Sequence, residues 1–193
     1  VQLVNDAQIW YAKNLIAKGG AAMASLATLP VLSASAPLKA GSKPFDYTDV
    51  KAGSLTRRAI ADIYVFPNVI KVVKINGAEV QDWLEMAAGA LNQIYPTKTE
   101  DQVLNNLFFP AYNFDVLAGT GDELTYKIDV KQPARFNKAG ERIHPQATRI
   151  VDLRYKGKAI NPEQEFLVVT NNYRASGGGS FPALKGGARI VID

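Results

Sequence analysis

Residues 166–179 of this chain read FLVVTNNYRASGGG. The apolar run at the start of this stretch, residues 166–169, predicts a strand. The strand leads into a tyrosine, an arginine and three glycines, and glycine lets a ligand approach bare backbone because it has no Cβ. Tyr173 offers a flat face to a planar ring, and Arg174 offers a fixed fork of donors to an anion. These features together indicate a nucleotide, and an ordinary strand-to-loop turn explains them equally well.

The composition is that of an ordinary globular domain. The chain has 193 residues, of which 47% are hydrophobic and 21% charged, enough to bury one full core. The net charge of +4 fits a small anionic ligand, but no basic run is longer than Arg57-Arg58, so a nucleic-acid polymer is not indicated. There is no cysteine, which excludes disulfides, thiolate metal sites and a cysteine nucleophile.

The two ends of the sequence suggest a fragment of a longer chain. The start, Val1-Gln2-Leu3, has neither Met nor the basic region of a signal peptide. The end, residues 188–193, is an expected strand with no closing element after it. No apolar run approaches the roughly 20 residues that cross a bilayer. We find no internal repeat and no linker that would divide the chain, so we expect a single domain.

The pattern along the chain predicts two long helices and several strands. Helical spacing of apolar residues places the long helices at residues 5–18 and 79–92, with a shorter helix at 56–64. Strands are expected at residues 29–36, 69–75, 112–116, 125–130, 148–155, 166–170 and 188–193. Asn76-Gly77 signals a hairpin or turn. The sequence therefore predicts an α+β domain with a largely antiparallel or mixed sheet and flanking helices.

Familiar catalytic motifs are not visible. His144 is the one histidine of the chain, and its place before Pro145 in a polar stretch predicts a surface loop. No clustered His and Asp residues suggest a catalytic metal, and no GxGxxG or P-loop occurs. Ser176 is followed by glycines but lacks the G-x-S-x-G of a nucleophile elbow. The chain itself is thus not expected to carry a catalytic group.

A second candidate stretch, residues 108–115, reads FFPAYNFD. A buried corner is the better explanation for three of its aromatics, namely Phe108, Phe109 and Phe114. Tyr112 is expected at a strand edge or in a loop, because its phenol needs water or a polar partner. Tyr112 and Tyr173 would then form a pair of flat faces, and stacking on each contributes about 1–3 kcal/mol per base.

A third candidate stretch, residues 33–41, reads SASAPLKAG. Small residues after a strand, followed by Lys39, would place a cation near a phosphate. A tight packing turn with a solvated lysine is the alternative, and it fits these residues better.

These stretches resemble the C-terminal domain of the 5′-nucleotidase superfamily, most closely that of the periplasmic bifunctional 2′,3′-cyclic-nucleotide 2′-phosphodiesterase/3′-nucleotidases. The resembling stretches keep their order along the chain and lie at residues 30–41, 61–68, 112–115, 132–135 and 170–179. The resemblance implies that residues 1–193 are the substrate-binding domain of a parent enzyme. It also implies an N-terminal metallophosphatase domain that holds two divalent metal ions, and a periplasmic or cell-envelope location.

The resemblance also implies where the nucleoside binds. It stacks the base between Tyr112 and Tyr173, which should then be exposed, lie at element ends and face each other across a slot of about 7 Å. The remaining substrate-binding residues that it implies are Arg174, Ala175, Ser176, Gly177, Gly178 and Gly179, together with Asn113 and Lys39. Related 5′-nucleotidases carry phenylalanines in the clamp, an acidic residue in place of Gly179 and an arginine in place of Lys39. The sugar and phosphate contacts of this chain are therefore expected to differ from theirs.

Three functions follow for comparison. The first is a nucleotide-binding domain whose parent opens 2′,3′-cyclic nucleotides and releases phosphate from 3′-nucleotides, while the fragment alone is inactive. The second is the C-terminal domain of a 5′-nucleotidase/UDP-sugar hydrolase. The third is a non-catalytic carbohydrate-binding or adhesion module, because aromatic faces and glycine loops also serve sugars.

Overall fold

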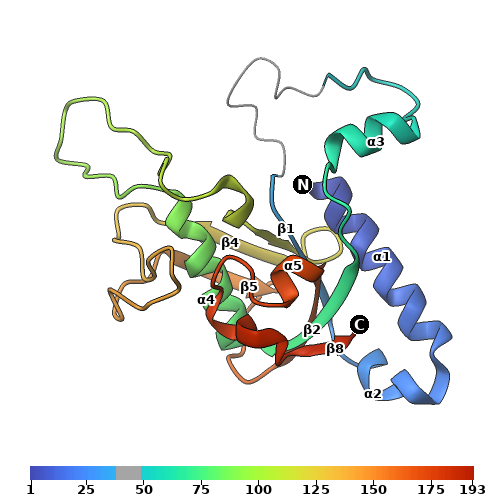
Figure 1. Cartoon of the computed structure of the whole chain (residues 1–193). Helices are drawn as coiled ribbons and strands as arrows, with labels where there is room; N and C mark the ends of the chain where they lie inside the picture. The colour runs from blue at the N-terminus through green and yellow to red at the C-terminus, as the bar shows by residue number, and fades with distance from the viewer. Residues whose placement is uncertain (38–48) are drawn as a thin grey trace.

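A five-stranded mixed sheet forms the centre of the computed structural model, which describes residues 1–37 and 49–193 (Figure 1). Its strands lie in the order β3-β1-β7-β2-β8. They are β1 (Val31–Ser35), β2 (Ile70–Asn76), β3 (Val116–Ala118), β7 (Glu165–Asn171) and β8 (Ile190–Ile192). β1 and β7 are parallel, and the other neighbours are antiparallel. This confirms the α+β class and the mixed sheet that the sequence predicts.

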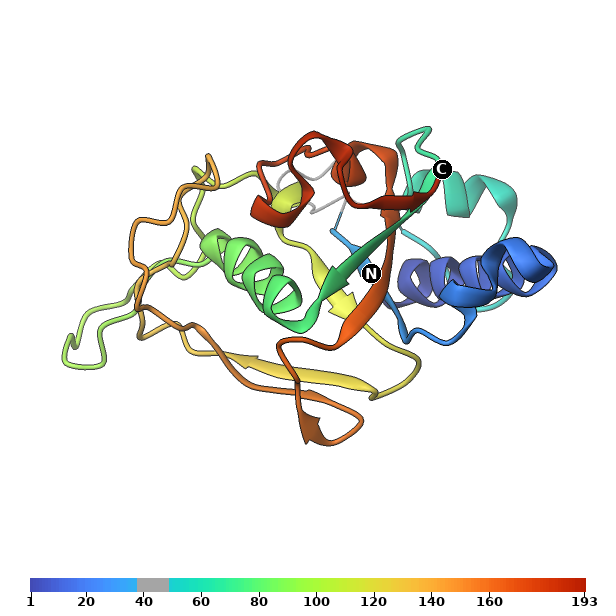
Figure 2. The same cartoon turned by 90° about the horizontal axis from the view of Figure 1, so that it is seen from below.

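Helices cover both faces of this sheet. α1 (Gln2–Lys18) lies on one side and α4 (Gly77–Ala87) on the other, as the blue and green helices of Figure 2 show. Leu167 and Val169 of β7 pack with the apolar side of α1, whereas Phe166 and Val168 pack in the cluster that includes α4. Burial on both faces is the reason that β7 is a continuous apolar run rather than an alternating one.

A second sheet packs against the far side of α4. It has three antiparallel strands, β4 (Leu124–Ile128), β5 (Ile150–Tyr155) and β6 (Lys158–Ala159). Buried Glu85 of α4 accepts hydrogen bonds from the backbone N–H groups of Arg149 and Ile150, at 3.1 and 2.9 Å, which joins helix and sheet. The shorter helices are α2 (Ala24–Ala27), α3 (Arg57–Ile63) and α5 (Asn172–Ala175), with 3₁₀ turns at Gly20–Met23, Ala88–Ala90, Ala111–Asn113 and Pro182–Gly187. No helix among the described residues is long and apolar enough to cross a membrane.

The expected turn at Asn76-Gly77 is wrong. Asn76 is instead the N-cap of α4, and its side chain accepts from the Glu79 N–H at 2.9 Å while the Glu79 carboxylate accepts from the Asn76 N–H. This capping box starts a helix directly after a strand. Gly77 is needed because a Cβ there would collide with the Asn161 carbonyl. The helix also ends earlier than expected, at Ala87, where a 3₁₀ turn follows.

The aromatic stretch before β3 also departs from expectation. Residues 112–116 do not form a strand: a 3₁₀ turn at Ala111–Asn113 holds Tyr112, and β3 begins only at Val116. Phe109 is buried as expected and Phe114 is half-buried, but Phe108 is 88% exposed and is not a core residue. Composition alone does not distinguish these neighbours, because the turn after Asn106 sends one ring inward and the other outward.

Candidate functional site

A cleft of about 260 Å³ opens at one end of the strands of the central sheet. The carboxyl ends of the parallel strands β1 and β7 lie at this end of the sheet, beside the first residues of β2 and β3. This is the end of a sheet at which α/β proteins commonly bind ligands. The cleft is lined by Ala36, Phe66, Asn68, Tyr112, Asp115, Asn171, Tyr173 and Arg174.

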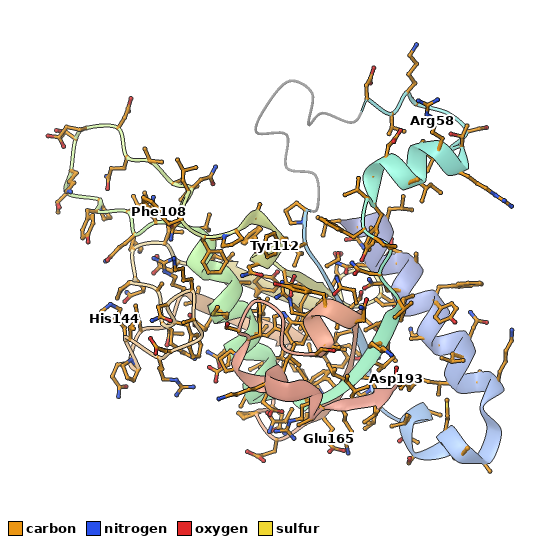
Figure 3. The ribbon with its side chains drawn as sticks, viewed as in Figure 1. Arg58, Phe108, Tyr112, His144, Glu165 and Asp193 are labelled. Carbon is orange, nitrogen blue, oxygen red and sulfur yellow. The ribbon has the colours of Figure 1, made fainter. Side chains whose placement is uncertain are left out.

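The two expected tyrosines meet at this cleft. Tyr112 comes from the 3₁₀ turn before β3, and Tyr173 comes from α5, directly after β7. Both side chains are 46% exposed, and the ring centroids lie 6.1 Å apart. Residues that are 61 positions apart in sequence are thus brought into contact, as the sequence predicts. Figure 3 shows Tyr112 near the middle of the molecule, well apart from His144, which lies in an exposed loop.

The arrangement of the two rings differs from the expected slot. Their planes are inclined by 81°, so the edge of one ring points at the face of the other. The ring quadrupoles favour this arrangement when two rings are in direct contact. The expected gap of two parallel planes is therefore not what the structure has. A base can stack on the free face of a ring, but it enters between the rings only if one of them turns.

Arg174 does not present a fork to an anion, contrary to the sequence-based expectation. It is 2% exposed, and its five N–H donors all have partners within the domain. Nε and Nη2 donate to the two oxygens of Asp115, at 2.7 and 3.2 Å. Nη2 also donates to the Tyr112 carbonyl at 2.8 Å, and Nη1 donates to Asn113 Oδ1 and to the Gly178 carbonyl. The guanidinium therefore links the segment that carries Tyr112 to the glycine loop that follows Tyr173.

Asp115 is the buried counter-charge of this network. The indole N–H of Trp83 donates to Asp115 Oδ2 at 2.9 Å. Burial raises the pKa of the Asp115 carboxyl, and the charge and hydrogen bonds of Arg174, with the Trp83 hydrogen bond, oppose that rise. The guanidinium of Arg174 also lies 4.0 Å from the centroid of the Phe181 ring, a distance typical of a cation–π contact. At the floor of the cleft, every N–H of Arg174 and both oxygens of Asp115 therefore have hydrogen-bond partners.

Gly178 and Gly179 of the loop leave room for the protein's own side chains. A Cβ on Gly178 would lie 2.5 Å from the Tyr173 carbonyl and 2.6 Å from its ring. A Cβ on Gly179 would collide with Arg174 Nη1 and Asn113 Oδ1. Gly179 also has a φ of +77°, which favours glycine in any case. The space that these glycines leave is thus filled by the tyrosine ring and the arginine.

The remaining predicted site residues are distributed unevenly. Ala175 is completely buried in the core, so its side chain cannot contact a ligand, and Asn113 is buried with its Oδ1 bound to Arg174. Ser176 is exposed at the end of α5, and Gly177 is partly exposed, but neither lines the cleft. Lys39 lies outside the described residues. Of the predicted site residues that the structure describes, the two tyrosines and Arg174 line the cleft, whereas Asn113, Ala175, Ser176 and the three glycines do not.

Five of the lining residues were not predicted as site residues, namely Ala36, Asp115, Asn171, Phe66 and Asn68. The last two, Phe66 and Asn68, bring an aromatic ring and an amide to the cleft. They precede β2, and Phe66 is exposed although it is aromatic. Asn68 donates from Nδ2 to the Tyr64 hydroxyl at 3.1 Å. The signal was an aromatic next to Pro67 within residues 61–68, one of the stretches that carry the family resemblance. Among residues 1–37 and 49–193, no group of three His, Asp or Glu side chains is placed to hold a metal ion.

Comparison with known proteins identifies the family. The family described as 5′-nucleotidase, C-terminal domain, matches residues 1–186. The chain belongs to this family. This 5′-nucleotidase C-terminal domain is 48% identical over 186 residues to the Trifunctional nucleotide phosphoesterase protein YfkN of Bacillus subtilis, a match that covers 95% of the chain and 12% of the relative. It is 46% identical over 182 residues to the 2′,3′-cyclic-nucleotide 2′-phosphodiesterase/3′-nucleotidase of Salmonella typhimurium, covering 92% of the chain and 27% of the relative.

A solved structure with the same fold supports the architecture. The 5′-nucleotidase precursor of Thermus thermophilus superposes with a TM-score of 0.62 over 98% of this domain and 28% of that chain, at 19% identity. At this identity the likeness concerns the fold alone. The domain thus spans little more than a quarter of the length of the Salmonella relative and an eighth of the Bacillus one.

Proposed function

We propose that this domain binds the nucleoside part of a nucleotide, with the planar base stacked between Tyr112 and Tyr173 after one of the two rings has turned. The observation that carries the proposal is the pair of half-exposed tyrosine rings at the mouth of the cleft, 6.1 Å apart. Exposed aromatic side chains are a recurrent way to bind nucleobases, and each stacked nucleobase contributes about 1–3 kcal/mol.

The chemistry of the cleft supports a small ligand. Phe66 adds a third aromatic side chain to the two tyrosines, and Asn68 adds an amide. Ligand pockets commonly hold about 300–1,000 Å³. The cleft, at about 260 Å³, lies just below that range, a size that suits one nucleoside.

For the parent protein we propose a 2′,3′-cyclic-nucleotide 2′-phosphodiesterase/3′-nucleotidase of the bacterial periplasm or cell envelope. The names of the relatives from Salmonella typhimurium and Haemophilus influenzae support this activity. The chemistry would be carried by two divalent ions in an N-terminal metallophosphatase domain, since such ions polarise a phosphoryl oxygen and activate water. This domain would supply substrate binding and, by itself, no turnover.

Calorimetry of the 193-residue chain tests the binding proposal. Adenosine and 3′-AMP should both bind, and a neutral oligosaccharide should not. Tyr173→Ala should remove most of the nucleoside affinity, with Ser176→Ala as the control, because Ser176 is exposed outside the cleft lining. Binding of the oligosaccharide in place of adenosine would instead identify a carbohydrate-binding or adhesion module.

Activity assays test the proposal for the parent. The full-length protein should hydrolyse 2′,3′-cyclic AMP and 3′-AMP in preference to 5′-AMP. A clear preference for 5′-AMP or a UDP-sugar would assign the domain to a 5′-nucleotidase/UDP-sugar hydrolase. The chain alone, supplied with Mn²⁺, Co²⁺ or Mg²⁺, should release no phosphate above a metal-only blank.

A further inference from the structure

The two residues on either side of Tyr173 connect the walls of the cleft. Tyr173 is one wall, and its neighbours Asn172 and Arg174, in the first turn of α5, bind two different segments of the chain. We call Asn172 and Arg174 the cleft bracket. Each binds a segment that is distant in sequence and that carries an aromatic side chain of the cleft.

Asn172 fixes the segment that carries Phe66. Its backbone N–H donates to the Val69 carbonyl at 2.9 Å, and its Oδ1 accepts from the Val69 N–H at 3.0 Å. Val69 lies three residues after Phe66 and one before β2, so the two hydrogen bonds set the position of this wall against Tyr173.

Arg174 fixes the segment that carries Tyr112. Nη2 donates to the backbone carbonyl of Tyr112 itself, at 2.8 Å. The same guanidinium is paired with Asp115 and with the Gly178 carbonyl, and Gly178 lies against the ring of Tyr173. One buried cation therefore touches the backbone of one tyrosine and the loop that supports the other.

We propose that the cleft bracket positions the tyrosine pair, and that Arg174 acts as a positioning residue and not as a ligand of the nucleotide phosphate. The proposal rests on the proposed function, since it concerns how the same cleft binds a nucleoside. With all five donors occupied and 2% exposure, Arg174 has no N–H group to give to a phosphate. Its effect on binding is exerted through the two rings.

The two roles predict different losses. A positioning residue affects base stacking, so its loss weakens adenosine and 3′-AMP by the same factor. A phosphate ligand affects only the phosphate, so its loss weakens 3′-AMP and leaves adenosine unchanged.

The test is calorimetry of Arg174→Lys with adenosine and 3′-AMP. Lysine keeps the charge but cannot reproduce the planar fork. We expect both ligands to bind about tenfold more weakly, the size of a lost stacking contact, with the ratio of the two affinities unchanged. The matched control is Arg135→Lys, which removes another guanidinium fork. Its partners are Asp82, Glu85, Thr148 and the Ala147 carbonyl, none of which lines the described cleft. A selective loss of 3′-AMP binding, or unchanged binding of both ligands, would overturn the proposal.

A readout without ligand separates this proposal from the proposed function. With 3-fluorotyrosine in the chain, the ¹⁹F resonances of Tyr112 and Tyr173 are assigned from their phenylalanine variants. Arg174→Lys should shift both resonances while the other tyrosines stay in place, and Arg135→Lys should shift neither. If the wild-type chain binds no nucleoside, the proposed function fails, whereas the bracket is still tested by these resonances.

Asn172→Ala provides a second variant in case Arg174→Lys does not fold. It deletes one hydrogen bond to Val69 and keeps the backbone bond. We expect it to shift the Tyr173 resonance and to weaken both ligands about two- to threefold, less than Arg174→Lys, because one neutral hydrogen bond is lost. Unchanged Tyr112 and Tyr173 resonances in every folded bracket variant would refute the positioning role.

Discussion

Two buried arginines of this domain, Arg149 and Arg174, bind different kinds of partner. Arg149 is 1% exposed and donates to the carbonyls of Gln132, Ala88 and Leu91, at 2.6–2.8 Å, where α4 ends. Arg174 is as deeply buried, but its partners carry or support the exposed tyrosines. The comparison teaches that burial and hydrogen bonding to carbonyls do not by themselves distinguish a structural arginine from a positioning one. What distinguishes them is whether the partners reach the surface of a cleft.

The largest expected effect is on Arg149. Arg149→Met should lower the free energy of unfolding by about 3–5 kcal/mol, because three backbone carbonyls, of which that of Ala88 is buried, lose their charged donor. Urea unfolding followed by circular dichroism measures it. The control is Arg154→Met, an exposed arginine paired with Asp152, which should cost no more than about 1 kcal/mol. Equal losses in the two variants would show that the helix end does not depend on Arg149.

The next effect is on Asp115, the partner of Arg174. Asp115→Asn leaves a buried guanidinium without its counter-charge, and we expect unfolding free energy to fall by about 3 kcal/mol. Nucleoside affinity should also fall in the variant that remains folded, since the Tyr112 segment loses its anchor. Urea unfolding and calorimetry, both well below the melting temperature, measure the two quantities. A variant that is destabilised but binds adenosine as the wild type does would place Asp115 with the structural group, beside Arg149.

A third effect concerns the tyrosine rings themselves. Tyr173→Ala should weaken adenosine binding by about 1–3 kcal/mol, and Tyr173→Phe should keep most of the affinity, because stacking needs the ring rather than the hydroxyl. The free energy of unfolding should change by less than about 1 kcal/mol in either variant, since the side chain is half-exposed. If Tyr173→Phe loses as much affinity as Tyr173→Ala, the phenol rather than the ring face is the binding group.

The smallest expected effect is on Gly178. Gly178→Ala places a methyl group 2.5 Å from the Tyr173 carbonyl and 2.6 Å from its ring, so the loop backbone and the ring must both shift, at a cost of at least about 1 kcal/mol in stability and a severalfold loss of adenosine affinity. Gly157→Ala is the control: its φ of +76° strains alanine, but nothing lies within 4 Å of the added carbon. The control should lose stability without losing affinity. Full affinity in Gly178→Ala would mean that the position of the Tyr173 ring is not critical.

The helices and strands could largely be predicted from local pattern. The helical spacing of apolar residues in α1 and α4 and the apolar run of β7 reflect which faces are buried, and that information is present in each segment alone. The prediction of a turn at Asn76-Gly77 was wrong because the same residue pair is compatible with a tight turn and with the start of a helix. Only the reciprocal bonds with Glu79 select the helix.

The candidate site was predictable in part, for a physical reason. An exposed tyrosine beside glycines and a second tyrosine in a polar, proline-containing stretch are local signals, and they indicated both rings of the cleft. The role of Arg174 was not a local property, because a guanidinium binds whichever acceptors the fold brings to it. Asp115, the Tyr112 carbonyl and the Gly178 carbonyl meet it only after β3 and β7 enter the same sheet. The residue types of a segment thus determine which interactions it is able to make. Long-range packing determines which of its hydrogen-bonding groups are already paired within the protein and which remain free to bind a ligand.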